Sequence, residues 1–455
     1  MKIGLRSSHA YSYKSGGFQA LKWHILACVA LGHDTTFLTA GSVSKEVLDN
    51  WIDGVSIRYY LPHCEKEYDF VIDIDHFSHA FNEAKRATFK HTFFPQGTVL
   101  PPPEGVKIYS NSAYTARHIK HNWGRDATPM YIPIDKYFHS GDKSHTILHV
   151  SRFSEPSEWA DKGHRQMIQA FKLVSKRLPG WNLALVGSVD PQQEYYIDSL
   201  LRLASGYPID IMPNVSNQKL TELYARSSFY WHATGVSLPT IPSAQEHMGI
   251  APLEAQASGC VPIVYNSGGM PEVVLNGATG VLFDNISDLP QATLDLMGNL
   301  PKWSQMSQAG QLWASSWMNF DNFVERIDDM LNDRPIRPMV DWRPQLKYKV
   351  SDITAVIPTL NSPMLSRCIE SMRETAPDMR ILVINNGATA IPEQDGVKVV
   401  NVGENIGFAR AHKLASSMIE TPLVFLLNDD VIARFKGWAE NLLLMMNSDS
   451  VGITG

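Results

Sequence analysis

Short apolar runs that alternate with runs of helical period are the feature that most limits how this chain can fold. Strand-like runs at 2–7 and 35–40 enclose a segment whose apolar residues recur at helical spacing. Chains that alternate in this way fold as α/β units with mainly parallel sheets. We therefore predict a doubly wound sheet. Its further strands are expected at 70–75, 92–97 and 107–112.

The same alternation returns twice further along the chain. A second series runs from 145 to 283, and two helices are expected between 302 and 333. A third series begins at Ile353, beyond a proline-rich stretch that is typical of a linker. At 455 residues the chain is too long for one ordinary core. We expect three α/β domains and one linker, at 1–140, 141–335, 351–455 and 336–350 respectively.

Composition excludes several classes of protein. Forty basic and 46 acidic residues give a net charge of -6, which offers no general attraction to nucleic acid. The four cysteines are far apart and have no histidines at zinc-finger spacing, which argues against a zinc site and a disulfide framework. No run of about 18 apolar residues and no export signal is found. We expect a cytoplasmic protein, with peripheral contact at the inner face of a membrane left open.

The segment "EHMGIAPLE" (246–254) suggests a binding site for an anion. Proline is tolerated in the first turn of a helix, so we place Pro252 at the first helical position and Glu254 near the third. The loop formed by Gly249, Ile250 and Ala251 would then present free N–H groups at a positive helix end, which suits a diphosphate.

Glu246 lies before this helix, so the helix dipole does not account for it. A carboxylate that faces a phosphate site is repelled unless it accepts hydrogen bonds from hydroxyl groups, such as those of a sugar. Taken alone, Glu246 and Glu254 are each better explained as structural residues. The pair, the "GIAP" turn and the following "SGGMPEVV" together favour a functional site.

Residues 246–283 resemble the donor-site signature of GT-B fold retaining glycosyltransferases of family GT4. The resemblance implies two Rossmann-like domains that face a cleft. It also implies that Glu254 binds the ribose of the nucleotide and that Glu246 holds the donor sugar near its reacting carbon. The expected reaction moves a sugar from a UDP- or GDP-type donor to a saccharide, lipid or protein acceptor, with retention of configuration.

The same resemblance implies an arginine and a lysine on the donor diphosphate, and Arg152 and Lys162 stand at matching positions. Two cations stabilise the departing diphosphate without a metal cofactor. Without the resemblance, these two residues would read as a solvated loop pair. Gly16 and Gly17, at the start of the first predicted helix, would lie beside the donor phosphates.

The first domain departs from the family pattern at one position. Many relatives carry a histidine in the slot where this chain reads "FFPQGT", with Gln96. His76 and His91 are nearby substitutes, although a lone histidine is more often structural. Two alternatives to a transferase therefore stay open: a scaffold that binds a nucleotide-sugar without catalysis, and a GT-B relative such as a sugar-nucleotide epimerase.

The third segment resembles a different family, the GT-A fold of family GT2, through "AVIPTLN", "VINNGA", "ENIGFARAHK" and "LLNDDV". The resemblance implies that Asp429 and Asp430 bind Mg²⁺ or Mn²⁺ together with a donor diphosphate. Asn386 replaces an aspartate that often contacts the base. A strand-end turn is the plainer explanation of "NDD". The segment covers only the nucleotide-binding half of the family, so we expect it to be incomplete and inactive.

Overall fold

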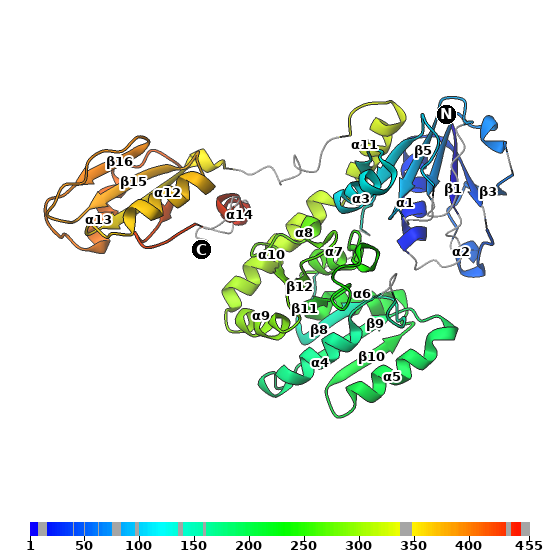
Figure 1. Ribbon diagram of the computed structural model, residues 1–455, viewed down its shortest axis with the longest axis horizontal. Coiled ribbons are helices and arrows are strands. Elements are labelled where there is room, and N and C mark those ends of the chain that lie inside the picture. The colour runs from blue at the N-terminus through cyan, green and yellow to red at the C-terminus, as the bar shows by residue number, and fades with distance from the viewer. Residues whose placement is uncertain are drawn as a thin grey trace. The chain divides into compact units, whose positions relative to one another are not determined.

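The computed structural model divides the chain into two compact units, Met1–Trp342 and Arg343–Gly455. We describe each unit by itself (Figure 1). The residues whose structure is described are 1–7, 16–39, 41–49, 51–61, 63–74, 83–95, 100–134, 140–157, 161–336, 348–433 and 438–446. Of the sequence predictions, His76, Gln96 and the last expected strand at 451–455 lie outside these residues.

The first unit begins with a seven-stranded sheet in the order β3-β2-β1-β4-β5-β6-β7. All of its neighbouring strands pair in parallel, and the order reverses between β1 and β4, as in a doubly wound sheet. The strands are β1 (Lys2–Ser7), β2 (Asp34–Thr39), β3 (Ser56–Tyr59), β4 (Phe70–Ile74), β5 (Ala87–Thr92), β6 (Lys107–Ser110) and β7 (Thr128–Pro129).

One predicted strand of this sheet is misplaced, because the strand expected at 92–97 is β5 at Ala87–Thr92. The carbonyl group of Phe93 has already left the ladder and accepts a hydrogen bond from the Thr115 hydroxyl at 3.0 Å. Pro95 follows and has no N–H group to donate to a neighbouring strand. The aromatic pair Phe93 and Phe94 is buried in the connection that follows the strand rather than in the sheet.

Among the described residues of this part of the chain, the α-helices are α1 (Gly16–Ala30), α2 (Lys45–Asp49) and α3 (Ala113–Trp123). Helix α1 is apolar along most of its length and is packed into the main hydrophobic core of the unit. It ends at Ala30 and is followed by Gly32, whose φ of 74° is the left-handed conformation that glycine adopts just after a helix C-terminus. We call residues 1–134 the N-terminal lobe.

The second sheet has six parallel strands in the order β10-β9-β8-β11-β12-β13. We call residues 140–317 the C-terminal lobe (Figure 1). Its strands are β8 (Ser144–Val150), β9 (Asn182–Gly187), β10 (Ile209–Pro213), β11 (Ser227–His232), β12 (Val261–Tyr265) and β13 (Val281–Phe283). Its helices are α4 (His164–Val174), α5 (Glu194–Ala204), α6 (Asn217–Arg226), α7 (Ile250–Ala257), α8 (Met270–Val273), α9 (Asp288–Met297) and α10 (Leu300–Trp317).

Helix α11 (Phe320–Leu331) follows the C-terminal lobe in the chain but packs on α1 of the N-terminal lobe. The rings of Trp23 and Phe320 lie 5.6 Å apart, and those of His24 and Phe323 lie 5.0 Å apart edge to face. The side chains of α11 therefore complete the core beneath the first sheet. The polypeptide therefore passes from the N-terminal lobe to the C-terminal lobe and then returns to the N-terminal lobe through α11.

The carboxyl ends of the strands in the C-terminal lobe approach one another very closely. A Cβ atom at Gly187, the last residue of β9, would lie 1.7 Å from the carbonyl oxygen of Ser151, just after β8. A Cβ atom at Gly163, which has a φ of 68°, would lie 2.5 Å from the carbonyl oxygen of Ala233. Glycine at these positions lets the loops after β8, β9 and β11 meet at one edge of the sheet.

The second unit contains a four-stranded parallel sheet in the order β16-β15-β14-β17. Its strands are β14 (Ile353–Thr359), β15 (Arg380–Asn385), β16 (Val397–Asn401) and β17 (Leu423–Leu426), and its helices are α12 (Leu365–Thr375), α13 (Phe408–Ser416) and α14 (Trp438–Met445). This agrees with the α/β segment predicted from Ile353. Among the described residues, no helix combines the length and apolarity needed to cross a bilayer.

The close approach of the backbone at Gly187 predicts that a single added methyl group lowers the stability of the protein. We expect Gly187→Ala to lower the free energy of unfolding by about 1–3 kcal/mol or more, because a backbone carbonyl group must move to admit the methyl group. Urea denaturation measures this difference. Gly298→Ala is the matched control, since its Cβ would lie 3.5 Å from its nearest neighbour at an unstrained φ of -70°. Equal stability of the two variants would contradict the prediction.

Candidate active site

Helix α7 begins two residues earlier than predicted. Its first residue is Ile250, and Gly249 precedes it with a φ of 90°, a left-handed conformation. A Cβ atom at Gly249 would lie 2.1 Å from the Cε atom of Met270, so packing against α8 fixes the start of the helix. Pro252 is therefore the third helical residue rather than the first. It still lies in the first turn, where proline is tolerated.

This shift also changes the position of Glu254. It is the fifth residue of α7, in the second turn, so the prediction that it lies near the third position is wrong. Its carboxylate instead accepts a hydrogen bond from the buried Tyr224 hydroxyl at 2.9 Å. The N–H groups of Ile250 and Ala251 are in the first turn and have no acceptor within the helix, as the predicted anion site requires.

Glu246 and Lys162, which are 84 residues apart in the sequence, meet in the structure. The Lys162 Nζ atom donates to the Glu246 Oε2 atom at 3.1 Å, and both side chains are about one-fifth exposed, at 22% and 21%. Lys162 directly precedes Gly163 and the start of α4. The structure therefore joins the residue expected on the diphosphate to the residue expected on the sugar.

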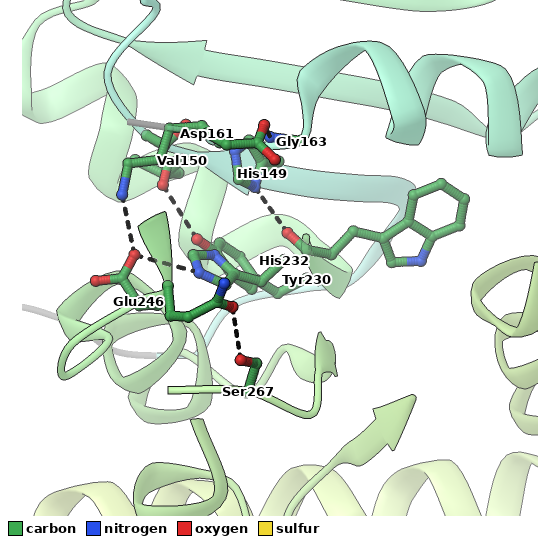
Figure 2. A network of polar contacts seen from close by, with 12 residues as sticks. His149, Val150, Asp161, Gly163, Tyr230, His232, Glu246 and Ser267 are labelled. Carbon is green, nitrogen blue, oxygen red and sulfur yellow. Dashed lines mark hydrogen bonds and ion pairs between the residues drawn. The ribbon is translucent and has the colours of Figure 1, made fainter. Parts of the chain in front are cut away.

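His232 is the third member of this cluster, and we did not predict it from the sequence. It is the last residue of β11 and is 2% exposed, and its Nε2 atom lies 3.4 Å from the Glu246 Oε2 atom. Figure 2 shows the Glu246 carboxylate next to the His232 ring. Its place at the carboxyl end of a parallel strand, where ligands bind in α/β sheets, is a signal that could have identified it.

Opposing effects act on the ionisation of Glu246. Burial by itself raises the pKa of the carboxyl group. The ammonium group of Lys162 and the hydrogen bond and charge of His232 act in the other direction and hold the pKa well below its usual range. Glu246 is therefore an ionised acceptor at neutral pH, ready to receive hydrogen bonds from hydroxyl groups.

The loop that carries Glu246 is held by the glycine-rich loop that follows β12. The N–H group of Gly269 donates to the Glu246 carbonyl oxygen at 2.7 Å, and a Cβ at Gly268 would lie 2.1 Å from that same oxygen. The Ser267 hydroxyl donates to the Gln245 side-chain oxygen at 2.6 Å, a contact visible in Figure 2. The backbone around Glu246 is thus fixed by close packing as well as by hydrogen bonds.

A buried chain of hydrogen bonds supports the Lys162 side of the site. The His149 ring faces the Trp231 carbonyl oxygen through Nδ1 at 2.8 Å and the Ser151 hydroxyl through Nε2 at 2.7 Å. Ser151 also lies 3.0 Å from Nε2 of His164, whose Nδ1 lies 3.3 Å from the Tyr196 hydroxyl. A carbonyl oxygen only accepts, so Nδ1 of His149 carries the proton. The donors then run in one direction from Tyr196 to Trp231.

The groups in this series of hydrogen bonds are uncharged near neutral pH. Burial lowers the pKa of His164 to about 3 and that of His149 well below its usual value. Ser151 precedes Arg152, and His164 lies two residues after Lys162. These hydrogen bonds therefore hold residues next to each of the two predicted cations, before Arg152 and after Lys162, without adding charge to the site.

The structure brings the remaining predicted residues together less directly. Arg152 is exposed, in the loop after β8, and no ion pair or hydrogen bond of its side chain is found among the described residues. Gly16 and Gly17 are the first two residues of α1 in the N-terminal lobe. His91, a candidate substitute for the missing histidine, is buried in the first sheet with its Nδ1 atom 3.2 Å from Nε2 of His24.

In the second unit, Asp429 and Asp430 follow β17, Asp429 half-buried and Asp430 exposed. Burial and, after it, the charges of the two nearby carboxylates raise the pKa of the Cys368 thiol to about 11. Carboxylate oxygens are ligands that Mg²⁺ accepts alongside donor phosphates, so the residue types fit the predicted metal site. Asn386 is buried and donates through its backbone N–H to the Thr359 carbonyl oxygen at 2.8 Å.

The contact between Lys162 and Glu246 predicts a stability difference that depends on pH. We expect Lys162→Met to lower the free energy of unfolding at pH 7 by about 1–3 kcal/mol, between the values for exposed and buried pairs. Without the cation, burial raises the pKa of Glu246, so the carboxyl group takes up a proton more readily as the pH falls. The difference between the variant and the wild type should therefore shrink toward pH 4.

Urea denaturation between pH 7 and pH 4 measures this effect. Lys219→Met on α6 is the control, because its pair with Glu222 at 3.7 Å is about half exposed on both sides. The control should change stability little at any pH. A loss of stability in Lys162→Met that is the same at every pH would show that Lys162 does not depress the pKa of Glu246.

The chain is similar in sequence to several glycosyltransferases. It is 27% identical over 187 residues to a GDP-mannose-dependent alpha-(1-6)-phosphatidylinositol monomannoside mannosyltransferase of Mycolicibacterium smegmatis, covering 38% of this chain and 45% of that protein. It is 23% identical over 253 residues to a GDP-Man:Man(3)GlcNAc(2)-PP-Dol alpha-1,2-mannosyltransferase of Dictyostelium discoideum, covering 50% and 47%. The chain thus spans about half the length of these curated relatives.

Solved structures show the same fold at low sequence identity. Sucrose-phosphate synthase from Thermosynechococcus elongatus has a TM-score of 0.58 at 14% identity, covering 73% of this chain and 98% of that one. Anabaena Alr3699/HepE in complex with UDP and glucose has a TM-score of 0.56 at 16% identity, covering 73% and 100%. The predicted GT-B architecture is confirmed.

Family models match both parts of the chain that the sequence patterns single out. The first match, described as glycosyl transferases group 1, covers residues 136–313 and includes Lys162, His232 and Glu246. The second, described as glycosyl transferase family 2, covers residues 354–455 and includes Asp429 and Asp430. Residues 136–313 of the chain therefore match the group 1 glycosyl transferases, and residues 354–455 match glycosyl transferase family 2.

Proposed function

We propose that the first unit transfers a sugar from a nucleoside-diphosphate sugar to an acceptor hydroxyl group with retention of anomeric configuration. The observation that carries this proposal is the ion pair between Lys162 and Glu246, at the carboxyl ends of parallel strands and close in sequence to the first turn of α7. Such a strand edge is where α/β sheets bind nucleotides. The family match supports the same reaction class.

In this proposal, the donor diphosphate binds to the N–H groups of Ile250 and Ala251 and to the cations Lys162 and Arg152. Fixed cations and amides stabilise the charge that develops on the departing diphosphate, which is the largest contribution that a rigid polar site makes to such a reaction. Lys162 then has the diphosphate as a second anionic partner. Glu246 is left to accept hydrogen bonds from hydroxyl groups of the sugar.

The protein contributes orientation and charge, and no covalent intermediate on a side chain is required. As the bond from the anomeric carbon to the diphosphate breaks, its electron pair leaves with the diphosphate. The acceptor oxygen forms the new bond on the same face, and the departing phosphate takes the acceptor proton. Glu254, placed beside Tyr224, is proposed to bind the ribose hydroxyl groups.

The donor and acceptor classes follow from relatives rather than from geometry. Two relatives are named as GDP-mannose-dependent or GDP-Man enzymes, and one structural neighbour holds UDP. We propose a GDP- or UDP-type donor, and a saccharide, glycolipid or protein acceptor reached from the cytoplasmic side. For the second unit we propose a separate nucleotide site in which Asp429 and Asp430 would hold Mg²⁺ or Mn²⁺.

A ligand-binding panel tests the proposal before any acceptor is known. A nucleoside diphosphate present at 100 times its dissociation constant should add about 2.7 kcal/mol of stability to the unit that binds it. Thermal unfolding is measured with GDP, UDP, GDP-mannose and UDP-glucose, each with and without Mn²⁺. We expect a shift that does not need the metal and that Lys162→Met removes. No shift with any of the four would overturn the proposed donor site.

Transfer and binding should respond differently to a change at Glu246. We expect Glu246→Gln to reduce transfer or donor hydrolysis on the order of 10²–10³-fold, by analogy with loss of one preorganised polar group. The affinity for the nucleoside diphosphate alone should stay near that of the wild type, because the diphosphate ligands are unchanged. Sugar release from a radiolabelled donor and calorimetric binding measure the two quantities. Glu222→Gln is the control on exposed α6. Wild-type turnover in Glu246→Gln would exclude this role.

A further inference from the structure

Glu272 joins the two lobes of the first unit through one carboxylate. It lies in α8 of the C-terminal lobe. Its Oε2 atom accepts a hydrogen bond from the N–H group of Ala113 at 2.8 Å, and its Oε1 atom accepts one from the N–H group of Tyr114 at 2.6 Å. The hydroxyl group of Tyr131 also donates to Oε2. All three donors belong to the N-terminal lobe.

The N-terminus of α3 needs hydrogen-bond acceptors from outside the helix. Ala113 and Tyr114 are its first two residues, whose N–H groups have no partner within the helix. The side chain of the local cap, Ser112, accepts a hydrogen bond from the N–H group of Thr115, at 3.1 Å. Glu272 supplies an acceptor to each of these two N–H groups, and the Ala113 N–H group also donates to the Tyr131 hydroxyl oxygen at 3.1 Å. The negative charge of Glu272 is favourable at the positive end of the helix dipole.

Tyr131 keeps its proton in this arrangement. Burial, and then the charge of Glu272 and the hydrogen bond to it, raise the pKa of the Tyr131 hydroxyl above its usual value. The hydroxyl group therefore remains a donor to the carboxylate throughout the neutral range. Tyr131 is 2% exposed, so the contact lies in a largely dry interface where a charge-assisted hydrogen bond is strong.

The same short segment is fixed to the candidate active site. Glu272 lies three residues after Gly269, whose N–H group holds the carbonyl oxygen of Glu246 at 2.7 Å. His247, the neighbour of Glu246, stacks on Phe94 of the N-terminal lobe with ring centroids 4.3 Å apart and planes at 12°. The Tyr114 hydroxyl donates to the Pro242 carbonyl oxygen at 3.0 Å. The lobes therefore touch on both sides of the Glu246 loop.

We propose that Glu272 is a positioning residue that clasps α3 to the loop holding Glu246 and so sets the placement of the N-terminal lobe over the donor site. Its effect on turnover rests on the proposed transferase function. The clasp itself does not, because it can be observed in the protein without any substrate. A residue that only capped a helix would stabilise α3 without influencing the reaction.

Hydrogen exchange tests the contact directly. In the full-length protein, we expect Glu272→Ala to speed exchange of the Ala113 and Tyr114 amides by about tenfold or more, because both carboxylate oxygens are lost. Glu272→Gln should have an intermediate effect, because its side chain keeps one oxygen acceptor. Ser112→Ala is the matched control: it removes the local cap of the same helix but leaves the contact between the lobes intact. Exchange at Ala113 and Tyr114 that is unchanged in Glu272→Ala would overturn the clasp, whatever the enzyme does.

Turnover then separates positioning from capping. We expect Glu272→Ala to lower kcat on the order of 10²-fold, the effect of a displacement of about 1 Å in a reacting geometry, with the affinity for a nucleoside diphosphate unchanged. Ser112→Ala should destabilise the protein by a similar amount with kcat unchanged. Equal kcat values in the two variants would show that Glu272 acts only as a helix cap, which contradicts the proposal.

Formate provides a rescue experiment for Glu272→Ala. A free carboxylate that binds at the vacated end of α3 should restore protection of the two amides, but it is not joined to the Glu246 loop, so kcat should stay low. Recovery of kcat by formate would show that the charge matters and the connection does not, which contradicts the proposal. If the wild type turns over no donor, the transferase function fails, while the exchange measurements still decide the clasp.

Discussion

The close approach of backbone at the carboxyl ends of the second sheet is the constraint on which the site depends. Gly163, Gly187, Gly249 and Gly268 each stand where a Cβ atom would lie 2.5 Å or less from another loop or side chain. Because these positions carry no side chain, four loops from separate strands reach one edge of the sheet. Lys162 and Glu246 project from those loops and meet His232, the last residue of β11, there. The close packing of the backbone therefore determines where the charged side chains of the site lie.

The site holds few charged groups, and the residues that carry charge are different from those that support the loops through hydrogen bonds. Glu246 is ionised because the cation beside it outweighs the effect of burial. The histidines behind the site are kept neutral by burial, so they orient the loops through hydrogen bonds without competing for the anion. A site built in this way presents one carboxylate and a small number of cations, which is what the proposed donor, with its phosphate and hydroxyl groups, would require.

Much of the fold could be predicted from the sequence, because buried parallel strands are short apolar runs bounded by polar turns. The strand β3 was missed because it is an edge strand with little apolar pattern, and β5 was misplaced because "TFFPQG" is more apolar than "ATFKHT". The start of α7 depends on a contact between Gly249 and Met270, which no local rule contains. Family resemblance assigned Lys162 and Glu246 to the same donor site, but their direct contact is seen only in the structure. His232 finds its partner Glu246 in the long loop after β11, and Glu272 finds its partners in the other lobe, so spacing alone could not reveal them.

The path of α11 has a consequence for how the protein is made. Helix α1 emerges early from the ribosome, but Trp23 and His24 are covered by Phe320 and Phe323, which are synthesised about 300 residues later. At translation rates of roughly 5–20 residues per second, the first sheet waits for at least about 15 seconds with an apolar helix face uncovered. During that interval the nascent chain offers a hydrophobic surface that a chaperone or a misfolded neighbour can occupy.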